Sequence, residues 1–167
     1  LDKDFAYLYV DVGGGSTELT FYENNAMQYE HSFNIGTIRL LNGLVTPTIW
    51  DEMKDEIKDK IKSKKTIVAI GSGGNINKIF SMSKTKDGKP MPVAVIKKYL
   101  KEMEKLSVVE RMHEYQIRED RADVIVPALT IFNNVMTWAD IKHIYVPKIS
   151  VADGLVHSIY AKVTGQK

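Results

Sequence analysis

The chain has 167 residues, of which 44% are hydrophobic, and its 23 lysines and arginines nearly balance 21 aspartates and glutamates. A chain of this length and composition can bury one core, so we expect a single domain. The near-neutral charge gives no sign of a nucleic-acid or membrane surface, and no apolar run approaches the ~20 residues that span a bilayer. The absence of cysteine excludes disulfides and thiolate metal sites and fits a cytoplasmic location.

The first third of the chain predicts three strands in succession. Residues 5–12 form a nearly continuous apolar run, which is typical of a strand buried on both faces. After Gly13–Gly15, polar and apolar side chains alternate over residues 18–22 and again over 27–33, with a turn predicted at Glu23–Asn25. We therefore expect a three-stranded antiparallel meander.

The rest of the chain alternates between helical and strand patterns. The predicted helices cover 38–44, 47–61, 75–80, 96–106, 122–138 and 152–162, and the predicted strands cover 66–70 and 143–146. Each of these two strands precedes a helix, so both should lie parallel to the first strand. The predicted fold is α/β and ribonuclease-H-like: a mixed five-stranded sheet with three antiparallel and two parallel strands, covered by helices.

Two glycine-rich loops follow predicted strands. In the first, Asp11 to Glu18, three glycines permit positive φ and a close approach of the backbone to a phosphate, and Ser16 and Thr17 add hydroxyl donors. Asp11 is a candidate ligand for Mg²⁺, and in a tight hairpin Glu18 faces it, so the two carboxylates would share one metal or its water shell. The alternative interpretation is a tight turn that needs glycine and that Asp11 caps.

The second loop, Gly71 to Asn75, connects a buried strand to a helix start. The N–H groups and the positive dipole end of that helix suit an anion, although an ordinary strand–helix turn is the alternative. Both loops lie at carboxyl ends of strands in one sheet, which is the edge where α/β folds bind ligands.

At these residues the chain resembles the exopolyphosphatase and guanosine pentaphosphate phosphatase family of the actin-like, sugar-kinase and heat-shock ATPase superfamily. The resemblance rests on the first loop with its Ser-Thr-Glu-Leu continuation and on four further stretches that occur in the family's order. These are Gly36–Leu40, Gly71–Gly74, Arg121–Ile125 with Pro127, and Ser150–Leu155. Two departures are Asn75, where the family usually has Thr, and Ala128, where a glycine often follows the proline.

The resemblance implies roles for individual residues. Asp11 and Glu18 would bind a divalent metal, Mg²⁺ or another, together with the attacking water, and Glu18 would be a catalytic residue. The implied phosphate-binding set is Gly13, Gly14, Gly15, Ser16, Thr17, Gly71, Ser72, Gly73, Gly74 and Arg39. For Arg39, which could reach a second phosphate, a solvated helix charge is the alternative.

The resemblance also implies that residues 1–167 are the second lobe of a two-lobed catalytic unit. The chain opens at Leu1 without an initiator Met and enters a strand at once, so we expect a preceding lobe that carries the general base, a glutamate. The joined lobes would release terminal phosphate from polyphosphate or guanosine pentaphosphate. A kinase or ATPase of the same superfamily and a non-catalytic phosphate- or nucleotide-binding module are the alternatives, and homodimerisation is a further expectation.

Some remaining side chains receive structural interpretations. Arg121 and Asp123 are expected to pair or to cap the helix that follows them. His31 lies on the apolar-alternating face of a strand, which favours core packing, and Trp50 and Trp138 are expected to anchor the core or the lobe interface.

Overall fold

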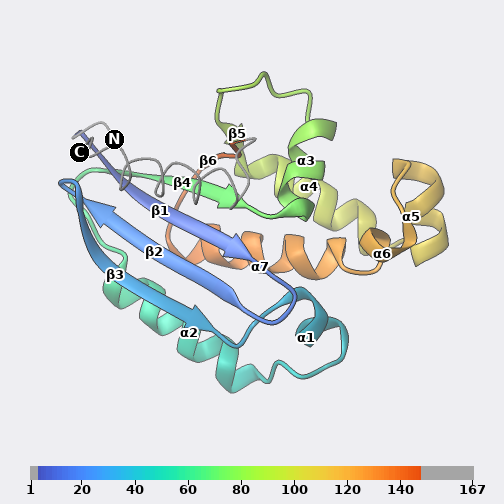
Figure 1. Ribbon diagram of the computed structural model, residues 1–167, viewed down its shortest axis with the longest axis horizontal. Helices are drawn as coiled ribbons and strands as arrows, with labels where there is room; N and C mark the ends of the chain where they lie inside the picture. The colour runs from blue at the N-terminus through green and yellow to red at the C-terminus, as the bar shows by residue number, and fades with distance from the viewer. Residues whose placement is uncertain (1–3, 148–167) are drawn as a thin grey trace, which may run out of the picture.

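The computed structural model describes residues 4–147, and these form one mixed sheet with helices against it (Figure 1). The sheet has six strands in the order β3-β2-β1-β4-β6-β5. Their bounds are β1 Phe5–Val12, β2 Thr17–Glu23, β3 Ala26–Phe33, β4 Thr66–Ser72, β5 Met91–Pro92 and β6 His143–Tyr145. The described helices are α1 Thr37–Leu41, α2 Pro47–Lys60, α3 Gly74–Met82, α4 Val93–Met103, α5 Val108–Tyr115, α6 Glu119–Ala122 and α7 Ile125–Trp138.

The predicted meander is confirmed in strand order and direction. β2 pairs antiparallel with β1 and with β3, while β4 pairs parallel with β1 and with β6. Asn24 and Asn25 connect β2 to β3 with φ of 54° and 62°. Asparagine tolerates this left-handed conformation, and two such residues in succession give the turn whose twist matches an antiparallel hairpin.

The helices bury one face of the sheet. In Figure 1, α2 and α7 run behind the strands, and α7 has more buried side chains than any other described helix. Alternate residues of β1, namely Ala6, Leu8 and Val10, are at most 1% exposed and join the core that α7 completes. Since side chains alternate across a strand, the residues between them lie on the opposite face.

The strand count differs from the prediction. The sixth strand, β5, has only two residues and pairs antiparallel with β6 through Met91 and Ile144, a length too short for any alternation to appear in the sequence. α5 was not predicted either, although Ser107 and Glu110 form a capping box whose Ser-x-x-Glu spacing is a sequence signal for a helix start.

The predicted helix over 122–138 corresponds to α7, which begins at Ile125, whereas Ala122 is the last residue of the separate short helix α6. Pro127 lies in the first turn of α7, where no intrahelical N–H bond is lost. The predicted helix at 152–162 and the family-like stretch at 150–155 lie outside the described residues.

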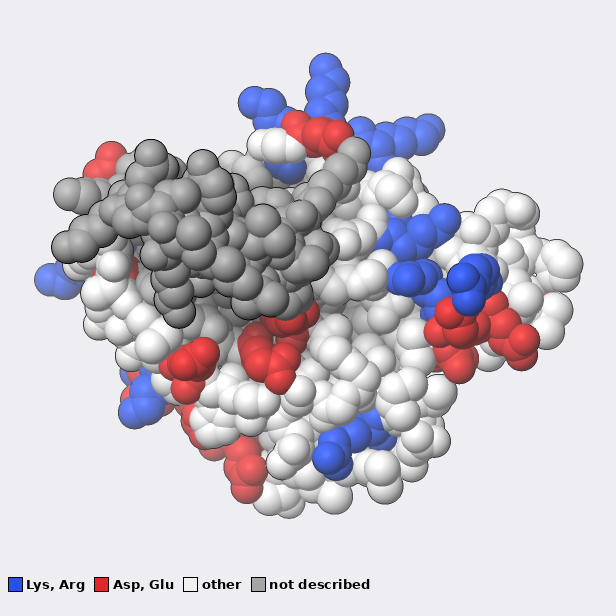
Figure 2. All heavy atoms as spheres, viewed as in Figure 1, with Lys and Arg blue, Asp and Glu red and all other residues white. Residues whose placement is uncertain are grey.

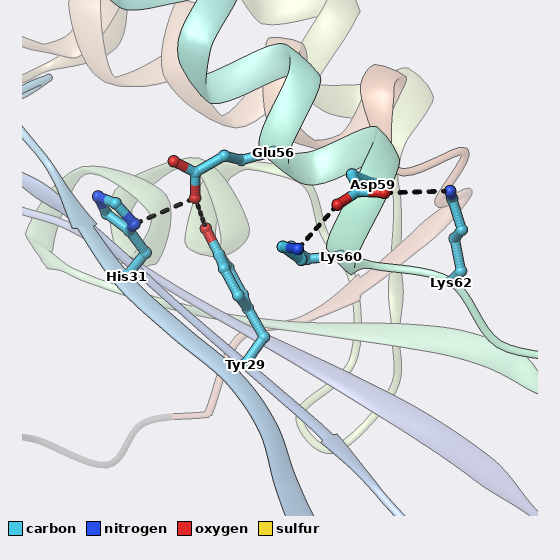
Figure 3. Close-up of polar contacts among 6 residues, drawn as sticks. All are labelled: Tyr29, His31, Glu56, Asp59, Lys60 and Lys62. Carbon is cyan, nitrogen blue, oxygen red and sulfur yellow. Dashed lines mark hydrogen bonds and ion pairs between the residues drawn. The ribbon is translucent and has the colours of Figure 1, made fainter.

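Three side chains fasten the edge strand β3 to α2 (Figure 3). The Tyr29 hydroxyl donates a hydrogen bond of 2.5 Å to Glu56 Oε2, and His31 Nδ1 lies 3.0 Å from the same oxygen. Both strand residues point toward the helix, and the His31 ring stacks on Phe33 with a centroid separation of 4.3 Å. The prediction that His31 is a core residue is wrong, because its side chain is 43% exposed and pairs with a carboxylate.

The face shown in Figure 2 carries groups of charged side chains of both signs, which agrees with the near-neutral composition. Within residues 4–147, no helix combines the length and the apolarity needed to cross a membrane.

Candidate functional site

The central strands bring four polar side chains into one row. Asp11 of β1 lies opposite Glu18 of β2 on one side and opposite Ser72 of β4 on the other, and Ser32 of β3 lies opposite Glu18. Side chains of directly opposed residues lie on the same face of a sheet. The predicted juxtaposition of Asp11 and Glu18 is therefore confirmed, on the face away from α7 and at the carboxyl ends of β1 and β4.

The two carboxylates differ in their surroundings. Glu18 Oε1 accepts hydrogen bonds from the hydroxyls of Ser16, at 2.5 Å, and Ser32, at 3.0 Å. Neither Glu18 Oε2 nor the Asp11 carboxylate accepts a hydrogen bond from the part of the chain that the structure describes. Carboxylate lone pairs of this kind bind cations and hydrogen-bond donors.

The first glycine loop, Gly13 to Ser16, is closed by a hydrogen bond of 3.0 Å from the Gly13 N–H to the Ser16 carbonyl. None of its three glycines has a positive φ, so the loop does not use the left-handed conformations that glycine permits. Within residues 4–147, no acceptor is found for the N–H groups of Gly14, Gly15 and Ser16. Three consecutive free N–H groups are the feature by which backbone loops bind phosphate oxygens.

The second loop lies beside the first. Gly73 has φ of +115°, a conformation that L side chains rarely adopt. A Cβ at Gly73 would lie 3.1 Å from the Val12 carbonyl oxygen and 3.9 Å from Asp11 Oδ1. The prediction that both loops meet at one sheet edge is confirmed, and Gly73 lets the start of α3 come close to Asp11.

Two residues of the predicted phosphate-binding set have structural positions instead. Thr17 is fully buried, and its hydroxyl donates a hydrogen bond of 2.6 Å to the Ile35 carbonyl, so that hydroxyl is not available to a ligand. A Cβ at Gly71 would lie 2.7 Å from Ile144 Cδ1 and 3.2 Å from Phe132 Cε1. Gly71 therefore faces the core, where glycine permits close packing of β4 against β6 and α7.

Two arginines lie at the loops. Arg39 Nε donates a hydrogen bond of 2.8 Å to the Gly15 carbonyl, so its position beside the first loop agrees with the prediction. Arg121 lies against the start of α3, where a Cβ at Gly74 would be 2.7 Å from Nη1 and 2.9 Å from Nη2. The expected pairing of Arg121 with Asp123 is not found: within residues 4–147 Arg121 makes no ion pair, and Asp123 Oδ1 is buried without a partner.

Sequence reasoning assigned Arg121 a structural role and so did not place it in the site. The sequence shows only a cation just before a predicted helix, which gives no information on a contact with Gly74, 47 residues earlier. One of the two departures from the family pattern is also located: Asn75 lies in the first turn of α3, and its Oδ1 is buried without a hydrogen bond from the described residues.

The carboxylate and hydroxyl oxygens in this row of polar side chains suit a hard cation that keeps part of its water shell. Within residues 4–147 no group of three or more His, Cys, Asp or Glu side chains could enclose a metal ion. Mg²⁺ is commonly held by one or two carboxylates together with waters and substrate phosphates. Asp11 and Glu18, flanked by serine hydroxyls and next to free N–H groups, fit that pattern.

Comparison of structures identifies similar folds in solved proteins. The Aquifex aeolicus Ppx/GppA family member superposes with a TM-score of 0.75 at 23% identity, covering 94% of this chain and 56% of that one. An exopolyphosphatase from Cytophaga hutchinsonii gives a TM-score of 0.76 at 21% identity, covering 99% of this chain and 59% of that one. This chain therefore spans well under two thirds of these proteins, and at such identities the similarity concerns the fold.

Comparison of sequences gives the family. No curated protein sequence matches the chain significantly. The model of the Ppx/GppA phosphatase family matches residues 2–163, nearly the whole chain. The two adjoining glycine loops, the Asp11–Glu18 pair and this match agree, and the chain belongs to the Ppx/GppA phosphatase family.

Proposed function

We propose that this chain is the phosphate- and metal-binding lobe of a phosphohydrolase that releases terminal phosphate from inorganic polyphosphate or guanosine pentaphosphate. The observation that carries the proposal is the position of the Gly14, Gly15 and Ser16 N–H groups near the Asp11 carboxylate, all of them without a hydrogen-bond partner among residues 4–147. A loop that offers donors to a phosphate and an adjacent carboxylate to its counter-ion suits phosphoryl transfer, where charge stabilisation contributes most of the catalysis.

Each group has a part in this proposal. The three N–H groups would bind oxygens of the terminal phosphate, and Asp11 and Glu18 would hold Mg²⁺ or another divalent cation. When bound, the cation would neutralise charge on the transferring phosphoryl group. Glu18, held by Ser16 and Ser32, would also orient the attacking water. The Arg121 guanidinium and the N-terminus of α3 would face a further phosphate of the substrate.

The remaining catalytic groups are assigned to a second lobe. Inversion at phosphorus needs a water opposite the leaving oxygen and a group that accepts its proton, and we propose that a glutamate of a preceding lobe accepts it. This chain spans 59% of the Cytophaga hutchinsonii exopolyphosphatase, which leaves room for such a lobe in a protein of that size. The isolated chain would then bind phosphate and metal without turnover.

The test measures phosphate release from long-chain polyphosphate by the natural protein that contains this chain. Replacing Glu18 with Gln keeps the size of the side chain but removes its charge, and we expect a loss of at least about a hundredfold in kcat. Glu102→Gln is the matched control, because Glu102 is an exposed carboxylate on α4 whose partner is Lys98. Unchanged activity in Glu18→Gln refutes the assignment. ATP turnover without polyphosphate turnover would favour a kinase or ATPase instead.

A further inference from the structure

The first glycine loop rests on a second segment of the chain, Ile35–Arg39, which we call the supporting segment. It follows β3 and includes the first three residues of α1, and it is bonded to each of the three glycine carbonyls. The N–H of Thr37 donates to the Gly13 carbonyl at 2.9 Å, those of Ile38 and Arg39 donate to the Gly14 carbonyl at 2.9 and 3.3 Å, and Arg39 Nε donates to the Gly15 carbonyl at 2.8 Å. The buried bond from Thr17 to the Ile35 carbonyl closes the other end.

Gly36 brings the two backbones into direct contact. A Cβ at this position would lie 2.4 Å from the Gly14 carbonyl oxygen and 2.5 Å from the carbonyl carbons of Gly14 and Gly15. The φ of Gly36 is −139°, an extended conformation that any residue adopts. Glycine is therefore required here by the close approach of the loop and not by its own dihedral angles.

This contact determines which way the loop's peptide groups point. In a trans peptide the carbonyl and the N–H of the following residue point in opposite directions, and the described residues contain no cis peptide bond. The carbonyls of Gly13, Gly14 and Gly15 point to the supporting segment. The N–H groups in the same three peptide units belong to Gly14, Gly15 and Ser16, and these are the groups without an acceptor in residues 4–147.

We propose that the supporting segment orients the loop for anion binding, and that Arg39 is a positioning residue that acts through the Gly15 carbonyl without contacting the anion. The proposal rests on the proposed function of the loop as a phosphate site. Gly13 and Gly14 are held by backbone N–H groups alone, whereas Gly15 is held by a side chain. Among the hydrogen bonds from the supporting segment to the glycine carbonyls, the bond from Arg39 Nε is therefore the one that a side-chain substitution removes without altering the backbone.

The experiment compares Arg39→Met with Arg111→Met in the full chain. Arg111 is the control, because its Nε also donates a hydrogen bond of 2.8 Å to a backbone carbonyl, that of Met103, and its Nη1 donates one of 3.0 Å to that of Ala122, neither of them in the glycine loop. Two quantities are measured: the affinity for tripolyphosphate with Mg²⁺ by calorimetry, at low and high salt, and amide hydrogen exchange without ligand. We expect Arg39→Met to weaken binding about tenfold, equally at both salt concentrations, and Arg111→Met to leave it unchanged.

Hydrogen exchange tests, independently of ligand binding, whether Arg39 holds the supporting segment to the loop. We expect the amides of Thr37, Ile38 and Arg39 to exchange about tenfold faster in Arg39→Met, with no change in β1 or α3. Unchanged exchange at these three amides overturns the proposal. A loss of affinity that disappears at high salt also overturns it, since that result assigns Arg39 to direct contact with the anion. If the unsubstituted chain binds no tripolyphosphate but exchange responds as expected, the support of the loop stands and the proposed phosphate site fails.

Discussion

Asp11 on β1 and Glu18 on β2 are direct cross-strand partners, and the loop between them contains the three N–H groups that have no acceptor in residues 4–147. The anion donors and the two carboxylates are therefore parts of one hairpin. A phosphate and a carboxylate so close together repel each other unless a cation lies between them. This arrangement makes the metal dependence of binding a direct test of the site.

Replacing Asp11 with Asn should change the affinity for tripolyphosphate in opposite directions with and without metal. In Mg²⁺ we expect binding to weaken at least about tenfold, because a neutral amide is a poor ligand for a hard cation. Without divalent metal we expect equal or tighter binding, because a negative charge has been removed from beside the anion. Calorimetry with and without a chelator measures both. Asp140→Asn, remote from the loop and paired with Lys142, should change neither. Weaker binding under both conditions would contradict this role for Asp11.

Two glycines of the loop region should respond differently to the addition of one methyl group. A Cβ at Gly15 would have no atom within 4 Å, so Gly15→Ala should change the free energy of unfolding by less than about 0.5 kcal/mol. A Cβ at Gly36 would overlap the backbone of Gly14, so Gly36→Ala should cost about 1–3 kcal/mol. Urea unfolding measures both differences. Similar costs for the two variants would show that the backbone contact at Gly36 relaxes freely.

Arg121 should contribute to the affinity for chain-like phosphates. Its guanidinium lies against Gly74 at the start of α3 and makes no ion pair within the described chain. Arg121→Met should therefore weaken binding of tripolyphosphate about tenfold and weaken binding of inorganic phosphate much less, because only the longer anion reaches it. Arg118→Met is the control, since Arg118 is 86% exposed and already pairs with Asp120. An equal loss for both anions would instead assign Arg121 to the terminal phosphate.

Local patterns were sufficient to predict the central part of this fold and site. The period-two alternation after Gly15 predicts the strand, and the seven-residue separation of Asp11 and Glu18 in a tight hairpin predicts that they face each other. The apolar run of β4 followed by glycines likewise predicts where the second loop lies. These inferences need only the geometry of one strand or one hairpin.

Contacts between distant segments could not be predicted in this way. Nothing near Thr17 in the sequence indicates that its hydroxyl is bonded to Ile35, 18 residues later, and Arg39 reaches Gly15 across 24 residues. The same holds for His31, whose strand pattern indicates an apolar face but not the presence of Glu56 on α2. In each case the sequence identifies the residue as noteworthy, and only the packing of separate elements determines its partner.

The contact between β3 and α2 should make stability depend on pH above 10. Burial, and then the hydrogen bond to Glu56, raise the pKa of the Tyr29 hydroxyl above its ordinary value of 10.0. In the unfolded chain this phenol ionises near pH 10, whereas in the folded protein it stays neutral to higher pH. Proton release thus favours unfolding, so this contribution to stability is complete below pH 10 and is lost as the pH rises toward the folded-state pKa.

Tyr29→Phe and Glu56→Gln test this contribution from its two sides. Tyr29→Phe removes the ionising group, and Glu56→Gln removes the carboxylate that helps to hold the phenol neutral (Figure 3). Urea midpoints measured at pH 9, 10 and 11 should fall less steeply with pH in both variants than in the unsubstituted chain. If the urea midpoint of Tyr29→Phe depends on pH as steeply as that of the unsubstituted chain, other tyrosines account for the loss of stability at alkaline pH. Tyr9 is one such residue, because burial also raises its pKa. If the urea midpoint falls less steeply with pH in both variants, the loss of stability at alkaline pH is assigned to the contact between Tyr29 and Glu56. This contact holds β3 against α2, and β3 also carries Ser32, which donates a hydrogen bond to Glu18.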